Sequence, residues 1–335
     1  MFLPKAQDKK PLVAALVCAL LSVVMLRTNM LSLFFLSPLG FVSSFGASFM
    51  WLAFIVASVF NGIFSLGVRI FYGAGMAGIG MDILSFVMFS LAFTWILCGN
   101  SGSVKLRTSY RVIIAAVAVS LCFMLVIVTS FGGSFADIIK TQSEAVSAII
   151  IASAGADAVR RSALESAISP DVVYEIIKTL ALRGGAVVSC VFMFIFNRQA
   201  GKTATIIFRR QKLQNELPFF HVHSNFIWAL SISLAAILLS SLLNIGALEI
   251  LAWNVLVICA ILFFGQGFGI ALFNFQKRAM SPGFRLFICV LVFLAVITPV
   301  VNVVLLGLLL LLGIAENWLP LRAPKNDGSA STPES

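Results

Sequence analysis

The chain has 335 residues, of which 60% are hydrophobic and only 11% charged, and its mean hydropathy is +1.06. This composition excludes an ordinary soluble domain. The net charge of +10 comes from short basic clusters between apolar runs, without the basic face or interleaved aromatic residues of a nucleic-acid binder, so we expect no nucleic-acid partner.

Apolar runs of helical length follow one another along the chain. A hydrocarbon layer of roughly 30 Å needs about 20 apolar residues per helix, and open strands cannot satisfy their backbone in lipid. We therefore predict an all-α, polytopic membrane helix bundle in the lipid bilayer, with about nine or ten transmembrane or half-spanning helices. The runs are 12–26, 30–45, 49–69, 76–98, 110–131, 182–197, 223–243, 250–275 and 284–314.

The basic clusters set the predicted orientation, because positively charged short loops stay in the cytoplasm. If 12–45 were one helix, the first two clusters would lie on opposite faces, whereas a break at 27–29 places all four on one face. We therefore predict an uncleaved first hairpin and a cytoplasmic N-terminus. The clusters are Lys5, Lys9 and Lys10; Lys105, Arg107 and Arg111; Arg198, Lys202, Arg209, Arg210 and Lys212; and Lys277, Arg278 and Arg285.

The same rule places segment 132–182 outside the cytoplasm, between the N-terminal membrane helices of 1–131 and the C-terminal ones of 183–314. Its charges are balanced and its apolar residues too few for an independent core, so we expect amphipathic helices against the outer surface. Ser169 and Pro170 are typical of a helix cap and first position, predicting a helix near 170–182.

Residues 284–314 would form a helix roughly 46 Å long at 1.5 Å per residue, longer than the bilayer needs. Pro299 and Asn302 offer a break. One tilted helix would place the C-terminus outside, and two short helices would place it inside. The tail, 315–335, is rich in Ser, Pro, Gly and Asn towards its end, where we expect disorder.

Polar residues within apolar runs are costly in lipid and mark candidate sites. Arg69 and Asp82 either pair inside the bundle or lie at the outer interface, where arginine reaches water. Asn254, Gln266 and Asn302 either bridge helices or line a small-molecule cavity.

Small residues at helical spacing predict close helix contacts. Ala15 and Ala19 form such a ridge on the first helix, which packs either within the chain or against the helix of another membrane subunit. Gly265, Gly267 and Gly269 predict a further close contact.

We find no motif for nucleotide binding or hydrolase chemistry, and the six cysteines lie singly. His221 and His223 have no Cys, Asp or Glu beside them in the sequence. The sequence therefore predicts no enzyme, no cofactor and no metal site.

Four short segments resemble the YybS-like family of bacterial membrane proteins. The most specific is 312–322, Leu-Gly-Ile-Ala-Glu-Asn-Trp-Leu-Pro-Leu-Arg, with Glu316 where the family usually has Asp. Leu217-Pro218 ahead of Trp228, Gly265-Gln266-Gly267-Phe268, and Ser37-Pro38-Leu39-Gly40 also fit. The resemblance covers about 12–322 and implies a multi-pass protein of the bacterial inner membrane with a cytoplasmic C-terminal motif.

The YybS-like group is distantly similar to substrate-binding subunits of energy-coupling-factor transporters and to the rod-shape protein MreD. The first similarity implies a small-molecule ligand and a coupling subunit that docks at Ala15 and Ala19. The second implies a membrane scaffold in an envelope-assembly complex, with a partner helix on the same ridge. Of the two, we favour the transport-related function.

Overall fold

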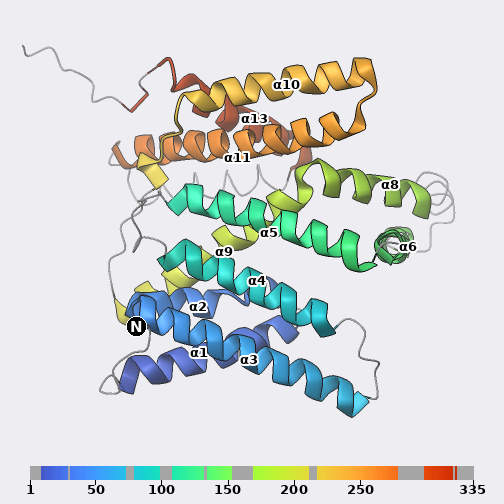
Figure 1. The fold of residues 1–335 in the computed structure, drawn as a ribbon. Helices are drawn as coiled ribbons and strands as arrows, with labels where there is room; N and C mark the ends of the chain where they lie inside the picture. Colours follow the sequence, from blue (N-terminus) through green and yellow to red (C-terminus); the bar gives the residue numbers. More distant parts are fainter. Residues whose placement is uncertain are drawn as a thin grey trace, which may run out of the picture. The chain divides into compact units, whose positions relative to one another are not determined.

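The computed structural model describes residues 9–28, 31–72, 79–98, 108–131, 134–152, 169–210, 217–277, 298–319 and 321–322 (Figure 1). Within these ranges all regular structure is helical, which confirms the predicted all-α fold. The chain forms two compact units, residues 1–213 and 214–335.

The first unit begins with the predicted hairpin. Helix α1, Lys9–Arg27, ends at the predicted break, and the chain returns through η1 (Ser32–Phe34), α2 (Ser37–Val42) and η2 (Ser43–Phe45). The Ser22 hydroxyl donates to the carbonyl of Phe35 at 2.5 Å, tying the two arms together. The returning arm is thus three short helical segments instead of the single helix expected over 30–45, with Pro38 in the first turn of α2 and Gly46, at φ 123°, ending η2.

Ala15 and Ala19 are fully buried on α1, which packs against α2 and against α3 (Ala47–Tyr72). The Ala15–Ala19 ridge, which the sequence predicted to pack either within the chain or against another subunit, thus packs within the chain. The docking of a partner helix at Ala15 and Ala19 is incompatible with this arrangement, since neither side chain is accessible.

Helix α9, Ala186–Arg209, continues past residue 197, where the sequence predicted the membrane helix to end. Arg198 and Lys202 therefore lie on a helix rather than in a loop. The helix continues because it packs closely on α2. Gly201 lies so near Gly40 that a Cβ added to Gly201 would come within 2.8 Å of the Gly40 Cα. Asn197 adds a hydrogen bond from its amide to the carbonyl of Leu33, at 2.8 Å.

Helices α4 (Ile79–Cys98) and α5 (Thr108–Phe131) complete the packing around α9. Phe93 and Phe194 are fully buried and stacked, with ring centroids 6.3 Å apart. The Arg111 guanidinium donates to the carbonyl of Ile96 at 2.7 Å, so the end of α4 lies beside the start of α5.

The predicted outer segment contains two helices that pack together, α6 (Ser134–Ala152) and α8 (Pro170–Leu180). The predicted start of α8 is confirmed: the Val172 amide donates to the Ser169 hydroxyl at 3.4 Å, and Pro170 is the first helical residue. Through η4, Ala181–Gly185, α8 runs into α9 with a bend of 46°.

The second unit consists of η5 (Leu217–Phe219), the antiparallel pair α10 (Asn225–Leu243) and α11 (Gly246–Lys277), and α13 (Pro299–Ala315), which packs on α11. Thr298 is extended and α13 starts at Pro299, one of the two residues at which the sequence offered a break. The choice between one helix and two over 284–314 stays a prediction. The expectations for 284–297 and for disorder in the tail fall outside the described residues.

Four of the described helices are long and apolar enough to cross a membrane, and the bent pair α8 and α9 provides a fifth candidate. The four are Lys9–Arg27, Ala47–Val68, Asn225–Leu243 and Gly246–Phe275. The chain is therefore a multi-pass membrane protein built as a helix bundle.

Gly267 and Gly313 bring α11 and α13 into backbone contact. A Cβ on Gly267 would lie 1.8 Å from the Leu309 oxygen, and one on Gly313 would lie 1.9 Å from the Phe263 oxygen. The predicted contact at the 265–269 glycines is thereby confirmed. Such contacts hold membrane helices together where lipid and side chains are equally apolar.

We predict that Gly267→Ala and Gly313→Ala each destabilise the second unit by about 3 kcal/mol, the upper end of the usual cost of overpacking, because the helices must separate. Gly307→Ala is the matched control on α13, since a Cβ there meets no atom within 4 Å. Thermal unfolding in detergent measures the effect. Equal melting temperatures for all three variants would contradict the close packing.

Candidate functional site

Four polar side chains gather near one end of α1, α3 and α4. The Arg27 guanidinium donates to the Asn61 side-chain oxygen at 3.0 Å and to the Ser65 hydroxyl, and it lies 3.7 Å from a carboxylate oxygen of Asp82. Its Cζ also lies 5.6 Å from the centroid of the Phe64 ring. We call Arg27, Asn61, Ser65 and Asp82 the first-unit polar cluster.

The side chains of the first-unit polar cluster differ in solvent exposure, with Asn61 and Ser65 buried and Arg27 and Asp82 partly exposed. Asn61 is completely buried and Ser65 is 3% exposed, whereas the side chains of Arg27 and Asp82 are 29% and 44% exposed. An ion pair as accessible as this one contributes at most about 1 kcal/mol. The loose contact between Arg27 and Asp82 is therefore one that a bound solute can replace.

Hydrogen-bond donors are in surplus at the buried end. Arginine has no acceptor, so the Asn61 oxygen must face Arg27 and the amide nitrogen points elsewhere. That nitrogen is buried and has no acceptor among the described residues. The Ser65 oxygen accepts from Arg27, which leaves its O–H free to donate. An unsatisfied buried amide costs about 1–3 kcal/mol, which a ligand with an acceptor would remove.

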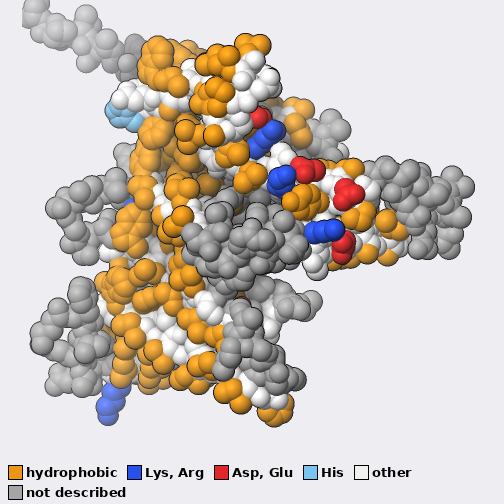
Figure 2. All heavy atoms as spheres, turned by 45° about the vertical axis from the view of Figure 1, so that its right-hand side comes forward, with side chains coloured by type: hydrophobic (Ala, Val, Ile, Leu, Met, Phe, Trp, Pro, Cys, Tyr) orange, Lys and Arg blue, Asp and Glu red, His pale blue; other side chains and the backbone are white. Residues whose placement is uncertain are grey.

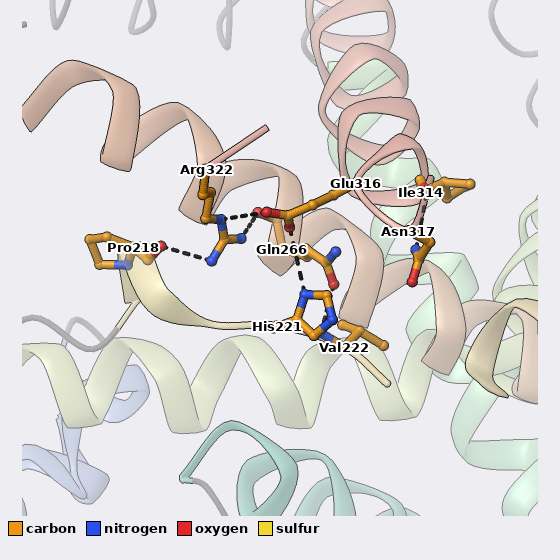
Figure 3. Close-up of polar contacts among 8 residues, drawn as sticks. All are labelled: Pro218, His221, Val222, Gln266, Ile314, Glu316, Asn317 and Arg322. Carbon is orange, nitrogen blue, oxygen red and sulfur yellow. Dashed lines mark hydrogen bonds and ion pairs between the residues drawn. The ribbon is translucent and has the colours of Figure 1, made fainter. Parts of the chain in front are cut away.

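A second group of polar side chains lies in the second unit, at the end of α13 (Figure 3). Arg322 donates to the carbonyls of Pro218 and Gln266, at 2.8 and 3.1 Å, and pairs with Glu316 at 2.9 Å. The Gln266 side-chain oxygen accepts from the Val222 amide at 2.7 Å. We call Gln266, Glu316 and Arg322, with their backbone partners, the second-unit polar cluster.

This second cluster is mainly a structural joint. Glu316 and Arg322 are 7% and 14% exposed, and burial lowers the pKa of the guanidinium, an effect that the nearby Glu316 carboxylate opposes. The other oxygen of Glu316 lies 3.9 Å from His221 Nδ1. A buried pair supplemented by carbonyl hydrogen bonds fixes the residues after α13 to η5 and α11.

The segments that carry the YybS-like resemblance in the second unit come together in this cluster. Leu217-Pro218, Gly265-Gln266-Gly267 and the stretch 312–322 supply its side chains, its carbonyls and the glycine contact of α11 with α13. Comparison with protein-family models, curated proteins and solved structures gave no match. The family resemblance therefore rests on these sequence segments alone.

The polar residues predicted from the sequence have different environments. Gln266 bridges α11 to the backbone at 222, and Asp82 has an arginine partner, Arg27. The side chain of Arg69 lies outside the described residues, so its pairing with Asp82 stays a prediction. The Asn254 amide donates to the Ile250 carbonyl of its own helix at 2.8 Å, and Asn302 lies in the first turn of α13.

Sequence reasoning missed Asn61 and Ser65. A signal was present, because residues four apart lie on the same face of a helix, and these two are polar positions inside the apolar run 49–69. No group of three or more His, Cys, Asp or Glu residues that could hold a metal occurs within the described part of the chain.

We predict that Glu316→Gln destabilises the protein by about 3 kcal/mol, because it leaves Arg322 buried without a counter-charge. Glu175→Gln is the control: Glu175 pairs with Lys178 at 3.2 Å in an exposed position, where the loss is at most about 1 kcal/mol. Thermal unfolding of both variants compares them. A larger loss for Glu175→Gln would contradict the structural role of the second-unit cluster.

Proposed function

We propose that this chain is a multi-pass protein of the bacterial inner membrane that binds a small solute at the first-unit polar cluster and serves a transport system as its solute-binding subunit. The observation that carries the proposal is the fully buried Asn61 amide, whose nitrogen has no acceptor among the described residues, beside a partly exposed Arg27 and Asp82. The similarity of the YybS-like group to energy-coupling-factor subunits points in the same direction.

The depth of the cluster supports a site that opens to the outside. Asn61 lies roughly 21 Å along α3 from its first residue, Ala47, at 1.5 Å per residue. In a bilayer roughly 30 Å thick, this places Asn61 in the half away from the Ala47 end of the helix. Lys9 and Lys10 begin α1, and Arg209, at the end of α9, bonds to Ser44 just before α3 starts. With these basic ends in the cytoplasm, the cluster faces the outer side.

The chemistry of the cluster favours a solute with an acceptor-rich group such as a carboxylate. The Asn61 amide nitrogen, the Ser65 hydroxyl and the Arg27 guanidinium are hydrogen-bond donors that two neighbouring helices, α3 and α1, bring into one cluster. A carboxylate can accept several such hydrogen bonds and replace Asp82 as the counter-charge of Arg27. Asp82 would then stay near the opening of the site.

Native mass spectrometry of the purified protein tests the proposal. We expect a small molecule with a carboxyl group to stay bound to the wild-type chain and to be lost in Asn61→Leu, which keeps the number and branching of the side-chain heavy atoms but removes the amide. Asn254→Leu, which removes another amide from a membrane helix, should retain the molecule.

Co-purification separates the transport role from the scaffold role. Recovery of a coupling membrane subunit with its ATPases supports transport. A chain that never carries a solute and co-purifies with cell-elongation or division proteins would instead be the MreD-like scaffold, and the solute-binding proposal would be abandoned.

The proposed topology also places the C-terminus in the cytoplasm. Arg322 contacts Pro218, so the end of α13 lies on the same side as His221 and the start of α10, which the charge rule assigns to the cytoplasm. A tag after Ser335 should resist protease in intact spheroplasts and be cleaved after lysis. Cleavage of the tag in intact spheroplasts would contradict the proposal and place the C-terminus outside the cytoplasm.

A further inference from the structure

The first-unit polar cluster holds one charge of each sign. Arg27 is the last residue of α1 and Asp82 lies in the first turn of α4, and a guanidinium nitrogen and a carboxylate oxygen of the two are 3.7 Å apart. Asn61 and Ser65 of α3 both accept hydrogen bonds from Arg27. The cluster therefore offers a solute a cation with two neutral groups beside it, and an anion in contact with that cation.

The two charges balance each other, and this balance restricts the solute. Hydrophobic side chains dominate the described surface in Figure 2, and net charge is costly in apolar surroundings. A solute whose only charge is a carboxylate would place two anions, its own and that of Asp82, around one guanidinium, and like charges in contact repel each other. A solute whose only charge is an ammonium would likewise be repelled by Arg27. A solute with both charges keeps the site neutral.

The hydrogen-bonding groups favour a solute in which the two charges are close together. An ammonium group has donors only and an ionised carboxylate has acceptors only, so an ammonium fits Asp82. A solute carboxylate fits Arg27, the Ser65 hydroxyl and the Asn61 amide nitrogen, which is buried and has no acceptor among the described residues. Because Arg27 and Asp82 are in contact, the ammonium and the carboxylate of the solute must be neighbours. α-Amino acids carry both groups on one carbon atom.

We propose that the solute is a zwitterion with the head group of an α-amino acid. Its carboxylate binds Arg27, Asn61 and Ser65, and its ammonium binds Asp82. The side chains of Arg27 and Asp82 are partly exposed, so both charges are accessible to such a solute. This inference rests on the proposed solute-binding function and names its substrate class. Asp82 is then the residue that separates amino acids from simple carboxylic acids.

Chemical labelling of the solute retained by the full-length wild-type protein tests the inference. The solute is released, treated with dansyl chloride, which labels amines, and in parallel amidated at its carboxyl groups, and both products are analysed by mass spectrometry. We expect one compound to react in both treatments. A solute with a carboxyl group but no amine would overturn this inference and leave the solute-binding proposal standing, whereas the absence of any solute would overturn both.

Asp82→Asn separates recognition of the ammonium from recognition of the carboxylate. Thermal unfolding is followed with an equimolar mixture of the standard amino acids, and then with propionate, isocaproate and hydrocinnamate, which are alanine, leucine and phenylalanine without the amine. The variant should need roughly tenfold or more amino acid for half-maximal stabilisation, because it loses a charge-assisted hydrogen bond. The deaminated acids should stabilise it at lower concentration than they do the wild type, because the repelling charge is gone.

Asp171→Asn is the matched control, since it makes the same change at an exposed position of α8 and should respond as the wild type does. An unchanged response of Asp82→Asn to amino acids would overturn the proposal. Equal weakening towards amino acids and deaminated acids would overturn it as well, because it would assign Asp82 a structural role only.

Discussion

Backbone contact between helices at small residues is the interaction on which the rest of this structure depends. In a bilayer, apolar side chains gain little by leaving lipid for protein, so helices associate where their backbones approach closely. Gly40 meets Gly201 in the first unit, and Gly267 meets Gly313 in the second. Gln266 of the second-unit polar cluster lies directly before Gly267, and the buried Ala15 and Ala19 of α1 extend the same principle to the opening hairpin.

The two polar clusters show two uses of costly side chains in a membrane protein. In the second unit, Arg322 engages Glu316 and two carbonyls, and the result is a joint. In the first unit, Arg27 contacts side chains of α3 and α4, and the Asn61 amide nitrogen has no acceptor within the described ranges. Neither cluster is completely paired, because the buried Gln266 amide nitrogen, like that of Asn61, has no acceptor among the described residues; the clusters differ in that Arg27 and Asp82 are partly exposed.

Much of the fold could be predicted from the sequence, because hydrophobic length and charge act locally. Charge balance located the end of α1 at Arg27, and proline chemistry located the start of α8 and marked Pro299, where α13 begins, as a possible break. The continuation of α9 past 197 could not be predicted, since it depends on a glycine contact with a distant segment. For the same reason the sequence indicated Asp82 as a pairing residue but not Arg27 as a partner, nor Asn61 and Ser65 beside it.

The contact between Arg322 and Pro218 has a consequence for the order of folding. The two residues are 104 positions apart, so Arg322 is synthesised well after Pro218. Chains fold from the N-terminus during translation, so the first unit can pack its helices while the second is still incomplete. The second-unit cluster can form only once the chain has been made as far as Arg322, and a ribosome that stops earlier releases a chain in which Gln266 and Glu316 lack the Arg322 guanidinium.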